Sequence, residues 1–211
     1  MTRSGTQYKL FDEPLHFPNG LIYRPDFINA EEEELLIEFI SAQRLKHATG
    51  GENGEYTAKR RYRHFGWGFD YKNENLIPGP PLPRFLERFS YRIEKWLDLP
   101  RGQVVEALIN EYSPGTPLGW HRDNEKFEHI IGVSLSGWAR MRFRPITPRS
   151  CQKDPKDVLS LELEPRSAYI MQNDVRWAWQ HSVAATRALR YSITFRTLPT
   201  GMKAPTPLRR A

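Results

Sequence analysis

The chain of 211 residues has one cysteine, Cys151, and no apolar run that approaches the roughly 18–20 residues of a membrane-spanning helix. A single cysteine excludes a disulfide framework and argues against a cysteine-based zinc site. The first seven residues lack the apolar segment of a secretory signal. Mean hydropathy is −0.65, yet 12% of the residues are aromatic, which argues against a disordered chain. We therefore expect a soluble, cytoplasmic, globular protein without a membrane partner.

Acidic residues are scarce in the second half of the chain. Residues 101–211 hold 17 of the 31 lysines and arginines but only 10 of the 25 aspartates and glutamates. The net charge of the whole chain is +6. An uneven basic charge of this kind attracts anionic partners such as nucleic acid. A basic surface that only keeps the protein in solution is the alternative interpretation.

The pattern of apolar residues predicts an α+β chain that is mainly β. Asn29 is a good N-cap for a helix over about 30–40, because acidic residues and then an apolar stripe follow it. A second helix is expected over about 83–98. Short strands separated by turn residues are expected at 21–27, 59–71, 104–112, 130–136, 139–144, 158–163, 168–172 and 189–196.

The segments between these elements suggest how the chain is divided. The glycine-rich residues 47–58 predict a loop, and the proline-rich residues 77–83 predict an irregular segment. Short strands in series with no helix between them favour a sandwich or a barrel. We expect an N-terminal extension over 1–20, one domain over 21–198 and a basic tail over 199–211.

A metal site is suggested by His121 and Asp123, which are separated by one residue at the end of an expected strand and turn. On an extended segment, residues two apart project to the same side, so the imidazole and the carboxylate can point at one spot. One distant histidine would complete a set of two histidines and one carboxylate. That set leaves three coordination positions open and suits non-haem Fe(II) and O₂. A surface histidine followed by a turn aspartate would give the same short motif.

Polar residues at the ends of two expected strands support the metal interpretation. Asn110 and Tyr112 share one face of a strand that ends just before His121. A further histidine, His181, follows Asp123 at a distance along the chain. These residues could complete the metal site and bind an acid beside it.

The last expected strand carries charge on one face. Arg190, Ser192, Thr194 and Arg196 alternate there with apolar residues. A buried arginine is destabilising unless it meets an anion. Two arginines on one inward face therefore predict a dicarboxylate or a similar ligand.

Taken together, these motifs resemble the AlkB family of Fe(II)- and 2-oxoglutarate-dependent dioxygenases. The motifs are Asn-x-Tyr, His-x-Asp, a distant histidine and Arg-x-x-x-Thr-Phe-Arg, and they cover residues 104–197; the segment 59–90 resembles the family more loosely. The resemblance implies a double-stranded β-helix (jelly-roll) core over about 104–197. It further implies N-terminal buttressing helices and a nucleotide-recognition lid over about 47–83.

The resemblance also implies roles for particular residues. His121, Asp123 and His181 would hold iron. Among the cosubstrate residues, Arg190 and Tyr112 would bind the distal carboxylate of 2-oxoglutarate, with Asn110, Ser192 and Arg196 as the other members. Ser192 departs from the asparagine that is usual in the family: a serine keeps a hydrogen bond but has a shorter reach.

The chemistry that the resemblance implies needs Fe(II), 2-oxoglutarate and O₂. Such an enzyme removes alkyl groups, such as those of 1-methyladenine and 3-methylcytosine, from DNA or RNA, and releases formaldehyde, succinate and CO₂. We expect a monomer that acts on DNA or RNA carrying alkylated bases. The same chemistry on a modified tRNA base or on a protein is the first alternative. A degenerate fold that only docks nucleic acid is the second.

Contacts to a substrate are less constrained by the sequence. The aromatic residues Phe65, Trp67, Phe69 and Tyr71 have a period of two, and Trp67 is the best candidate to sandwich a base against His121. Aromatic residues that fill the core of a half-buried strand are the alternative.

Charged residues near these motifs could also contact a nucleic acid. Glu125 could favour a cationic base, although a surface glutamate would look the same. Phosphate contacts are predicted for two basic groups that could equally be solvated surface residues, namely Arg60, Arg61 and Arg63, and Arg140, Arg142 and Arg144.

Overall fold

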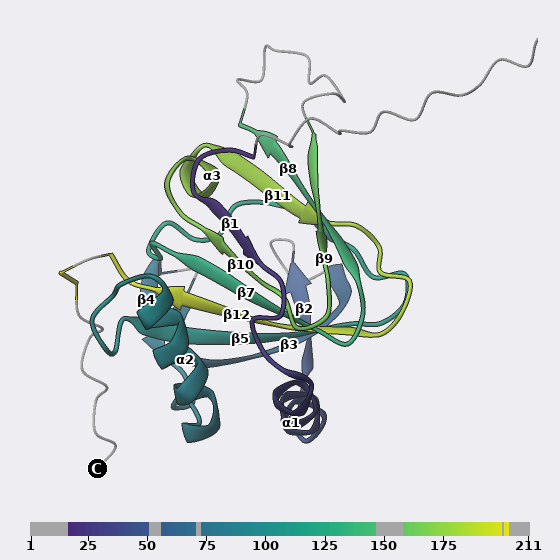
Figure 1. Ribbon diagram of the computed structural model, residues 1–211, viewed down its shortest axis with the longest axis horizontal. Helices are drawn as coiled ribbons and strands as arrows, with labels where there is room; N and C mark the ends of the chain where they lie inside the picture. The colour runs from purple at the N-terminus through teal and green to yellow at the C-terminus, as the bar shows by residue number, and fades with distance from the viewer. Residues whose placement is uncertain (1–16, 51–55, 71–72, 147–157, 200, 203–211) are drawn as a thin grey trace, which may run out of the picture.

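Two antiparallel sheets form the body of the protein, and two helices cover the outer side of the larger sheet (Figure 1). The computed structural model describes residues 17–50, 56–70, 73–146, 158–199 and 201–202. Within those residues, no helix is long and apolar enough to cross a membrane. The mainly-β α+β class expected from the sequence is confirmed.

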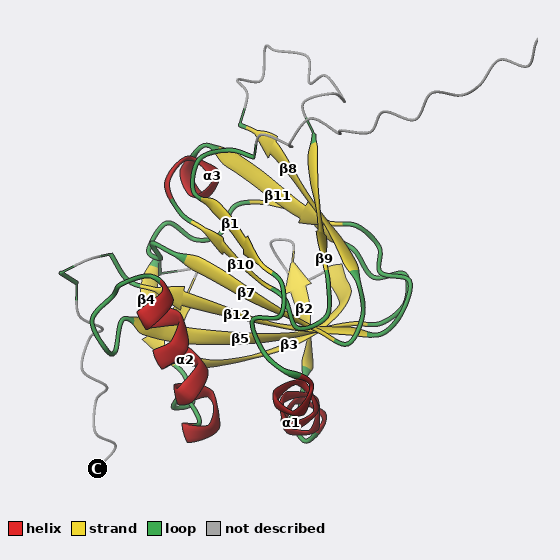
Figure 2. Cartoon of the chain, in the orientation of Figure 1, coloured by secondary structure: helices red, strands yellow, loops and turns green. Residues whose placement is uncertain are grey.

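The larger sheet has eight strands and the smaller sheet four, in the part of the chain that is described (Figure 2). The larger sheet has the order β1 (Leu21–Arg24), β10 (Ala168–Met171), β7 (Ile130–Leu135), β12 (Arg190–Thr197), β5 (Val104–Tyr112), β3 (Tyr56–Asp70) and β2 (Lys46–Gly50), with β4 (Asn75–Pro78) paired to β3. The smaller sheet has the order β6 (Leu118–His121), β11 (Trp179–Val183), β8 (Ala139–Pro145) and β9 (Leu159–Leu163). The helices are α1 (Ala30–Ser41), α2 (Arg84–Trp96) and α3 (Asn173–Trp177).

Helix α1 begins where the sequence predicts it. The side chain of Asn29 accepts a hydrogen bond from the backbone N–H of Glu32 at 2.8 Å, and the Glu32 carboxylate accepts one from the Asn29 N–H at 3.2 Å. This reciprocal pair satisfies two of the free N–H groups at the helix start. The helix then buries Leu36 and Ile40 against the larger sheet.

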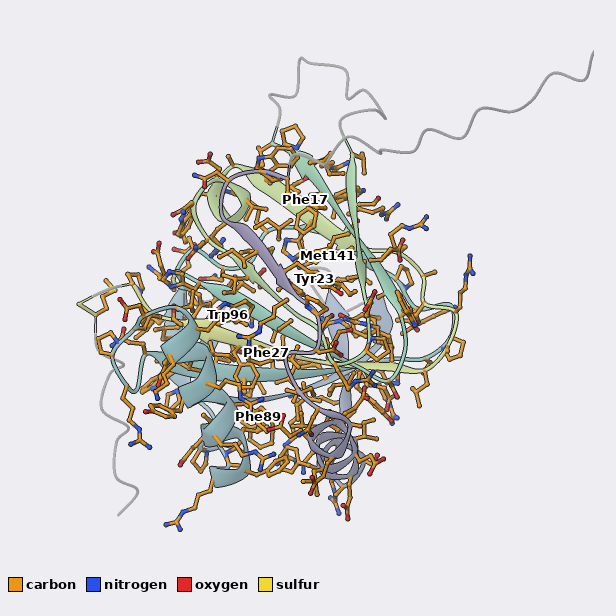
Figure 3. All side chains as sticks on the ribbon, in the orientation of Figure 1. Phe17, Tyr23, Phe27, Phe89, Trp96 and Met141 are labelled. Atoms are coloured by element: carbon orange, nitrogen blue, oxygen red, sulfur yellow. The ribbon has the colours of Figure 1, made fainter. Side chains whose placement is uncertain are left out.

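A first hydrophobic core lies between the larger sheet and helices α1 and α2. Phe27, Phe89 and Trp96 occupy it, as Figure 3 shows, and the rings of Phe27 and Trp96 stack at 5.2 Å. Phe65 of β3 is 4% exposed and belongs to the same core. The helices therefore fix the outer face of the strands whose inner face carries the polar residues.

A second hydrophobic core lies between the two sheets. Phe17, Tyr23 and Met141 belong to it (Figure 3). Strand β12 shows how one strand serves both sides: Ile193 and Phe195 are buried in the first core, and the residues that alternate with them face the second sheet. Period-two alternation thus places a row of polar side chains between the sheets.

The sequence prediction fails at the short and glycine-rich elements. Strand β2 pairs with β3 where a loop was expected over 47–58, and β4 extends into the first residues of the segment over 77–83 that was expected to be irregular. The strands β6 and β11 and the short helix α3 were not predicted. These elements depend on pairing with strands that are distant in the sequence, and local composition does not report such pairing.

Candidate metal centre and pocket

Two histidines and one aspartate meet at the inner side of the smaller sheet. His121 ends β6 and His181 lies on β11, directly opposite it in the strand register, and Asp123 follows in the loop after β6. Their ligand atoms all lie within 4.8 Å of one another. The ring centroids of the two histidines are 4.2 Å apart. The predicted triad of metal ligands is therefore present.

Neighbouring groups orient the ligand atoms. The Nδ1 of His121 lies 2.8 Å from the carbonyl oxygen of Gly119, so Nδ1–H donates there and Nε2 is left for a metal. Arg196 donates to the Oδ1 of Asp123 from Nε at 3.1 Å and from Nη2 at 2.5 Å. The Oδ2 of Asp123 lies 3.4 Å from the Nε2 of His181. One oxygen of the carboxylate is thus fixed by arginine and the other faces the histidines.

The electrostatics keep both kinds of ligand in the form that binds a metal. Burial lowers the pKa of His181 to about 3, although Asp123 acts in the opposite direction. Burial alone would raise the pKa of Asp123, but Arg196 and the two histidines hold it well below the usual range. The imidazole is therefore neutral and the carboxylate ionised near pH 7, as coordination of a metal requires.

Arg176 of α3 holds the loop that carries Asp123, a role that the sequence did not suggest. It is 3% exposed, and it donates to the backbone carbonyl oxygens of Asn124 and Phe127, both at 2.7 Å. It also lies 3.4 Å from the carbonyl oxygen of Asp123. A buried arginine cannot be told from an exposed one in a short aromatic segment, so no sequence signal was available.

A pocket of about 600 Å³ opens between the sheets beside the triad. Strands β5 and β12 form one wall, the triad lies at another, and β3 and β4 contribute a third. All five predicted cosubstrate residues line it: Asn110, Tyr112, Arg190, Ser192 and Arg196.

The far end of the pocket fits a carboxylate. Arg190 is 2% exposed, and its Nη1 is buried without a hydrogen-bond partner among the described residues. Its Nε donates to the hydroxyl of Ser134 at 3.3 Å, and its guanidinium lies 5.1 Å from the ring centroid of Tyr112. Burial lowers the pKa of Arg190, and no carboxylate of the described chain pairs with it. A buried cation with a free donor fits the distal carboxylate of 2-oxoglutarate.

The end of the pocket near the metal has its charges paired. Arg196 donates to Asp123 and also to the carboxylate of Glu106 at 2.8 Å. Burial would lower the pKa of Arg196, but Glu106 and Asp123 raise it above the usual range. In the middle of the pocket, the side-chain oxygen of Asn110 accepts a hydrogen bond from Arg60. The two arginines of β12 therefore differ: Arg196 is neutralised by protein carboxylates and Arg190 is not.

The predicted aromatic contacts are only partly brought to the pocket. Phe65 is wrong as a substrate contact, because it lies on the outer face of β3, with its ring centroid 6.1 Å from that of Phe39. Trp67 packs against the second core and does not line the pocket. Phe69 does line it. Tyr71 lies outside the described residues.

The first basic group is divided between the two faces of β3. Arg60 turns into the pocket, where it bonds to Asn110. Arg61 turns outward and forms a bidentate pair with Glu111, with N–O distances of 2.7 and 2.8 Å. Arg63 does not line the pocket either, and its guanidinium lies over the ring of Phe65 on the same strand. A continuous basic edge along this strand is therefore absent from the part that is described.

The second basic group lies on the outer surface of the smaller sheet. Arg140, Arg142 and Arg144 alternate with buried residues of β8. Arg140 pairs with Glu162 at 2.5 Å, and the guanidinium groups of Arg142 and Arg144 lie 5.2 and 4.2 Å from the ring centroid of Trp120. The predicted row of cations is present, but it is on the opposite face of the sheet from the metal ligands. Phosphate binding there stays a prediction.

Acidic residues around the pocket differ from the expectation. Glu125 is exposed and does not line the pocket, so its predicted role in recognising a base gains no support from its position. The neighbouring Asn124 does line it, as does Asp70 near the end of β3. Asp70 could have been noticed as the acidic end of the aromatic segment.

Comparison with known proteins agrees with this arrangement. The sequence pattern of the 2OG-Fe(II) oxygenase superfamily matches residues 20–196. The tRNA (carboxymethyluridine(34)-5-O)-methyltransferase ALKBH8 of Macaca fascicularis is 29% identical over 181 residues, covering 82% of this chain and 26% of that protein. The Probable RNA/DNA demethylase ALKBH6 of Danio rerio is 24% identical over 176 residues, covering 79% of this chain and 70% of that protein. The chain thus spans about a quarter of the macaque protein.

A solved structure has the same fold. The structure of OsALKBH1 superimposes with a TM-score of 0.61 at 15% identity, and the match covers 86% of this chain and 100% of that one. The two facing sheets are consistent with the double-stranded β-helix of AlkB proteins. With the metal triad in place, with sequence similarity to the AlkB homologues ALKBH8 and ALKBH6, and with the superfamily pattern matched over residues 20–196, the chain belongs to the 2OG-Fe(II) oxygenase superfamily and is AlkB-like within it.

Proposed function

We propose that this oxygenase removes alkyl groups from nucleic-acid bases by oxidation. The observation that carries the proposal is the pocket beside the metal triad, to which β3 and β4 contribute flat and apolar side chains and the exposed Arg122 contributes a cation. Tyr62, His64, Phe69 and Ile77 are these side chains of β3 and β4, and Arg122 is exposed at the lining near the triad. Flat side chains next to cations are what a base and its phosphate require. The relative named as a probable RNA/DNA demethylase supports this function, and the relative named as a tRNA methyltransferase supports only the nucleic-acid class of substrate.

The cofactors of the family define what the site residues do. Iron, when bound, supplies the oxidation of a substrate C–H bond by O₂, which is coupled to conversion of 2-oxoglutarate into succinate and CO₂. His121, Asp123 and His181 would hold the metal. We assign the distal carboxylate of 2-oxoglutarate to Arg190 and Tyr112, and its other end to Asn110, Ser192 and Arg196. No side chain has to remove a proton from the substrate, so we assign no general base.

The reaction explains how an alkylated base is restored. Insertion of oxygen into a C–H bond of an N-methyl group gives an N-hydroxymethyl group, which releases formaldehyde and leaves the unmodified base. A base inside a duplex cannot reach the triad, so it has to be single-stranded or flipped out. We infer that the β3–β4 hairpin, which lies within the predicted lid over 47–83, covers the base once it has entered.

Direct assay of modified oligonucleotides tests this function. Protein loaded with Fe(II) under anaerobic conditions would receive 2-oxoglutarate and air together with oligonucleotides, single- and double-stranded, that carry 1-methyladenine, 3-methylcytosine or an etheno adduct. We expect mass spectrometry to show loss of the adduct with an equal amount of succinate. The Asp123→Ala variant serves as the blank. Succinate release without any change in the oligonucleotides would contradict the proposal.

A second candidate is hydroxylation of a modified wobble uridine in tRNA. Two positions favour it: Arg60 places a cation in the pocket, and Glu125, which would attract a cationic base, lies outside it. The similarity to ALKBH8 over 82% of the chain points the same way. Mass spectrometry of tRNA nucleosides separates the two candidates. This reaction adds one oxygen atom to the base, whereas dealkylation removes carbon from it.

The outer arginines give a prediction about nucleic-acid binding. If Arg142 and Arg144 contact phosphates, the double variant Arg142→Gln/Arg144→Gln should bind a single-stranded oligonucleotide more weakly. Its plot of log affinity against log salt should lose about 0.7 of slope for each contact removed. Fluorescence anisotropy over a range of salt measures both quantities. Arg101→Gln, which removes one positive charge beyond the end of α2, should leave the slope unchanged. An unaltered slope in the double variant would contradict phosphate binding on this face.

A further inference from the structure

Tyr169 reaches the pocket because its side chain crosses the neighbouring strand. It lies on β10 directly opposite Gly132 of β7, and its ring crosses that glycine. A Cβ atom at Gly132 would come within 2.3 Å of the Tyr169 ring carbons Cε1 and Cζ and within 2.5 Å of the hydroxyl oxygen. No residue with a side chain fits there unless the tyrosine moves. Gly132 therefore opens the path by which the phenol reaches across β7 towards β12.

The phenol points into the part of the pocket that holds the charged residues. Asp123, Tyr112, Arg190 and Arg196 all contribute to its electrostatic environment. Burial, together with Asp123 and Tyr112, raises the pKa of Tyr169 above its usual value, and the two arginines oppose this only in part. The hydroxyl therefore keeps its proton at any physiological pH and is able to donate a hydrogen bond.

The hydroxyl of Tyr169 and the guanidinium of Arg190 are both hydrogen-bond donors that could bind the same acceptor. Among the described residues, neither the Tyr169 hydroxyl nor Nη1 of Arg190 has a hydrogen-bond partner. Both groups line one pocket, and Tyr112 completes the set on the neighbouring strand. Two phenols and one guanidinium without a protein carboxylate form a site rich in donors and short of acceptors.

We propose that Tyr169 is a third binding residue for the distal carboxylate of 2-oxoglutarate, donating a hydrogen bond to it beside Arg190 and Tyr112. The inference rests on 2-oxoglutarate as the cosubstrate of the family and on the assignment of its distal end to Arg190. It does not depend on the nucleic-acid substrate proposed above. A tyrosine that only fills the space above Gly132 is the competing explanation, and the two differ in what the hydroxyl contributes.

The Tyr169→Phe variant removes that hydroxyl and leaves the ring over Gly132. Protein loaded with Mn(II), which binds without turnover, would be titrated with 2-oxoglutarate. We expect the variant to bind 2-oxoglutarate about 10-fold more weakly, as loss of a hydrogen bond to a charged group predicts. The same titration with 2-oxobutyrate, which lacks the distal carboxylate, should give equal affinities for variant and wild type. This difference between two ligands would not arise from a packing role.

Two further variants make the test decisive. Tyr191→Phe is the matched control, because Tyr191 lies on the other face of β12 in the first core, and it should bind 2-oxoglutarate as the wild type does. An equal loss for both acids in Tyr169→Phe, or no loss for either, would overturn the proposal. Arg190→Met tests the assignment of the distal carboxylate to Arg190. Undiminished binding of 2-oxoglutarate by that variant would place the distal carboxylate elsewhere. Neither result would bear on whether the substrate is a nucleic acid.

Discussion

Replacement of His121 by alanine should abolish turnover and leave the protein folded. His121 is only partly buried, and its side chain is hydrogen-bonded to the carbonyl oxygen of Gly119. Its loss therefore costs little stability but removes one of three metal ligands. Substitution of groups that merely orient ligands already costs about 10–100-fold, so removal of a ligand should lower the rate by at least about 100-fold. Succinate release measures the rate, and thermal unfolding checks the fold.

Asp123→Ala should be equally inactive but also less stable. The Asp123 carboxylate is 4% exposed and accepts two hydrogen bonds from Arg196. Glu106 still pairs with Arg196 in the variant, so the free energy of unfolding should fall by about 2 kcal/mol, less than for a completely unpaired buried charge. The two variants together separate the loss of a metal ligand from the loss of a buried ion pair.

A control histidine makes the comparison specific. His47 is exposed, and its side chain lies 2.8 Å from the carbonyl oxygen of Ala58, away from the pocket. His47→Ala should retain full turnover. Binding of Mn(II) should be normal in this variant and weak in His121→Ala. The loss of the electron paramagnetic resonance signal of the free ion measures this binding. Normal metal binding and turnover in His121→Ala would refute the ligand assignment.

Much of the fold could be predicted, because the long strands carry their own signal. Strand β12 alternates polar and apolar residues from Arg190 to Arg196, and β5 has the predicted bounds of 104–112. The failures are short elements: β6 has four residues, and β2 lies in a glycine-rich stretch. Such segments become strands only because a distant partner supplies the hydrogen bonds, as β11 does for β6.

The meeting of the three candidate metal ligands could also be predicted, and so could the row of polar residues from β5 and β12 that lines the pocket, since motif spacing and alternation place them. The basic run was harder to interpret, although alternation alone would have shown that Arg60 and Arg61 leave the strand on opposite faces. Tyr169 could not have been found in this way. Its position depends on Gly132, a residue distant in the sequence, and neither residue carries a pattern of its own.

Arg190→Met should lose 2-oxoglutarate binding without losing stability in the absence of the ligand. Nη1 of Arg190 carries two N–H donors that have no partner among the described residues. A hydrogen bond between a charged group and its partner is worth about 1.5–3 kcal/mol, so loss of both should lower the affinity by about 100-fold or more. In the protein without ligand, however, the Arg190 charge is buried and no described carboxylate pairs with it. Replacement of such a charge by an apolar side chain of similar length is neutral or stabilising.

Thermal unfolding with and without ligand tests both parts of this prediction. Wild-type protein with Mn(II) and 2-oxoglutarate at about 100 times its dissociation constant should gain about 2.7 kcal/mol, and Arg190→Met should gain almost nothing under the same conditions. Arg176→Met is the matched comparison, because Arg176 is equally buried but donates to backbone carbonyl oxygens. Its loss leaves those acceptors unsatisfied and should destabilise the protein without ligand. If Arg190→Met proved as unstable as Arg176→Met, the side chain of Arg190 would be structural, and its charge would not be held for a ligand.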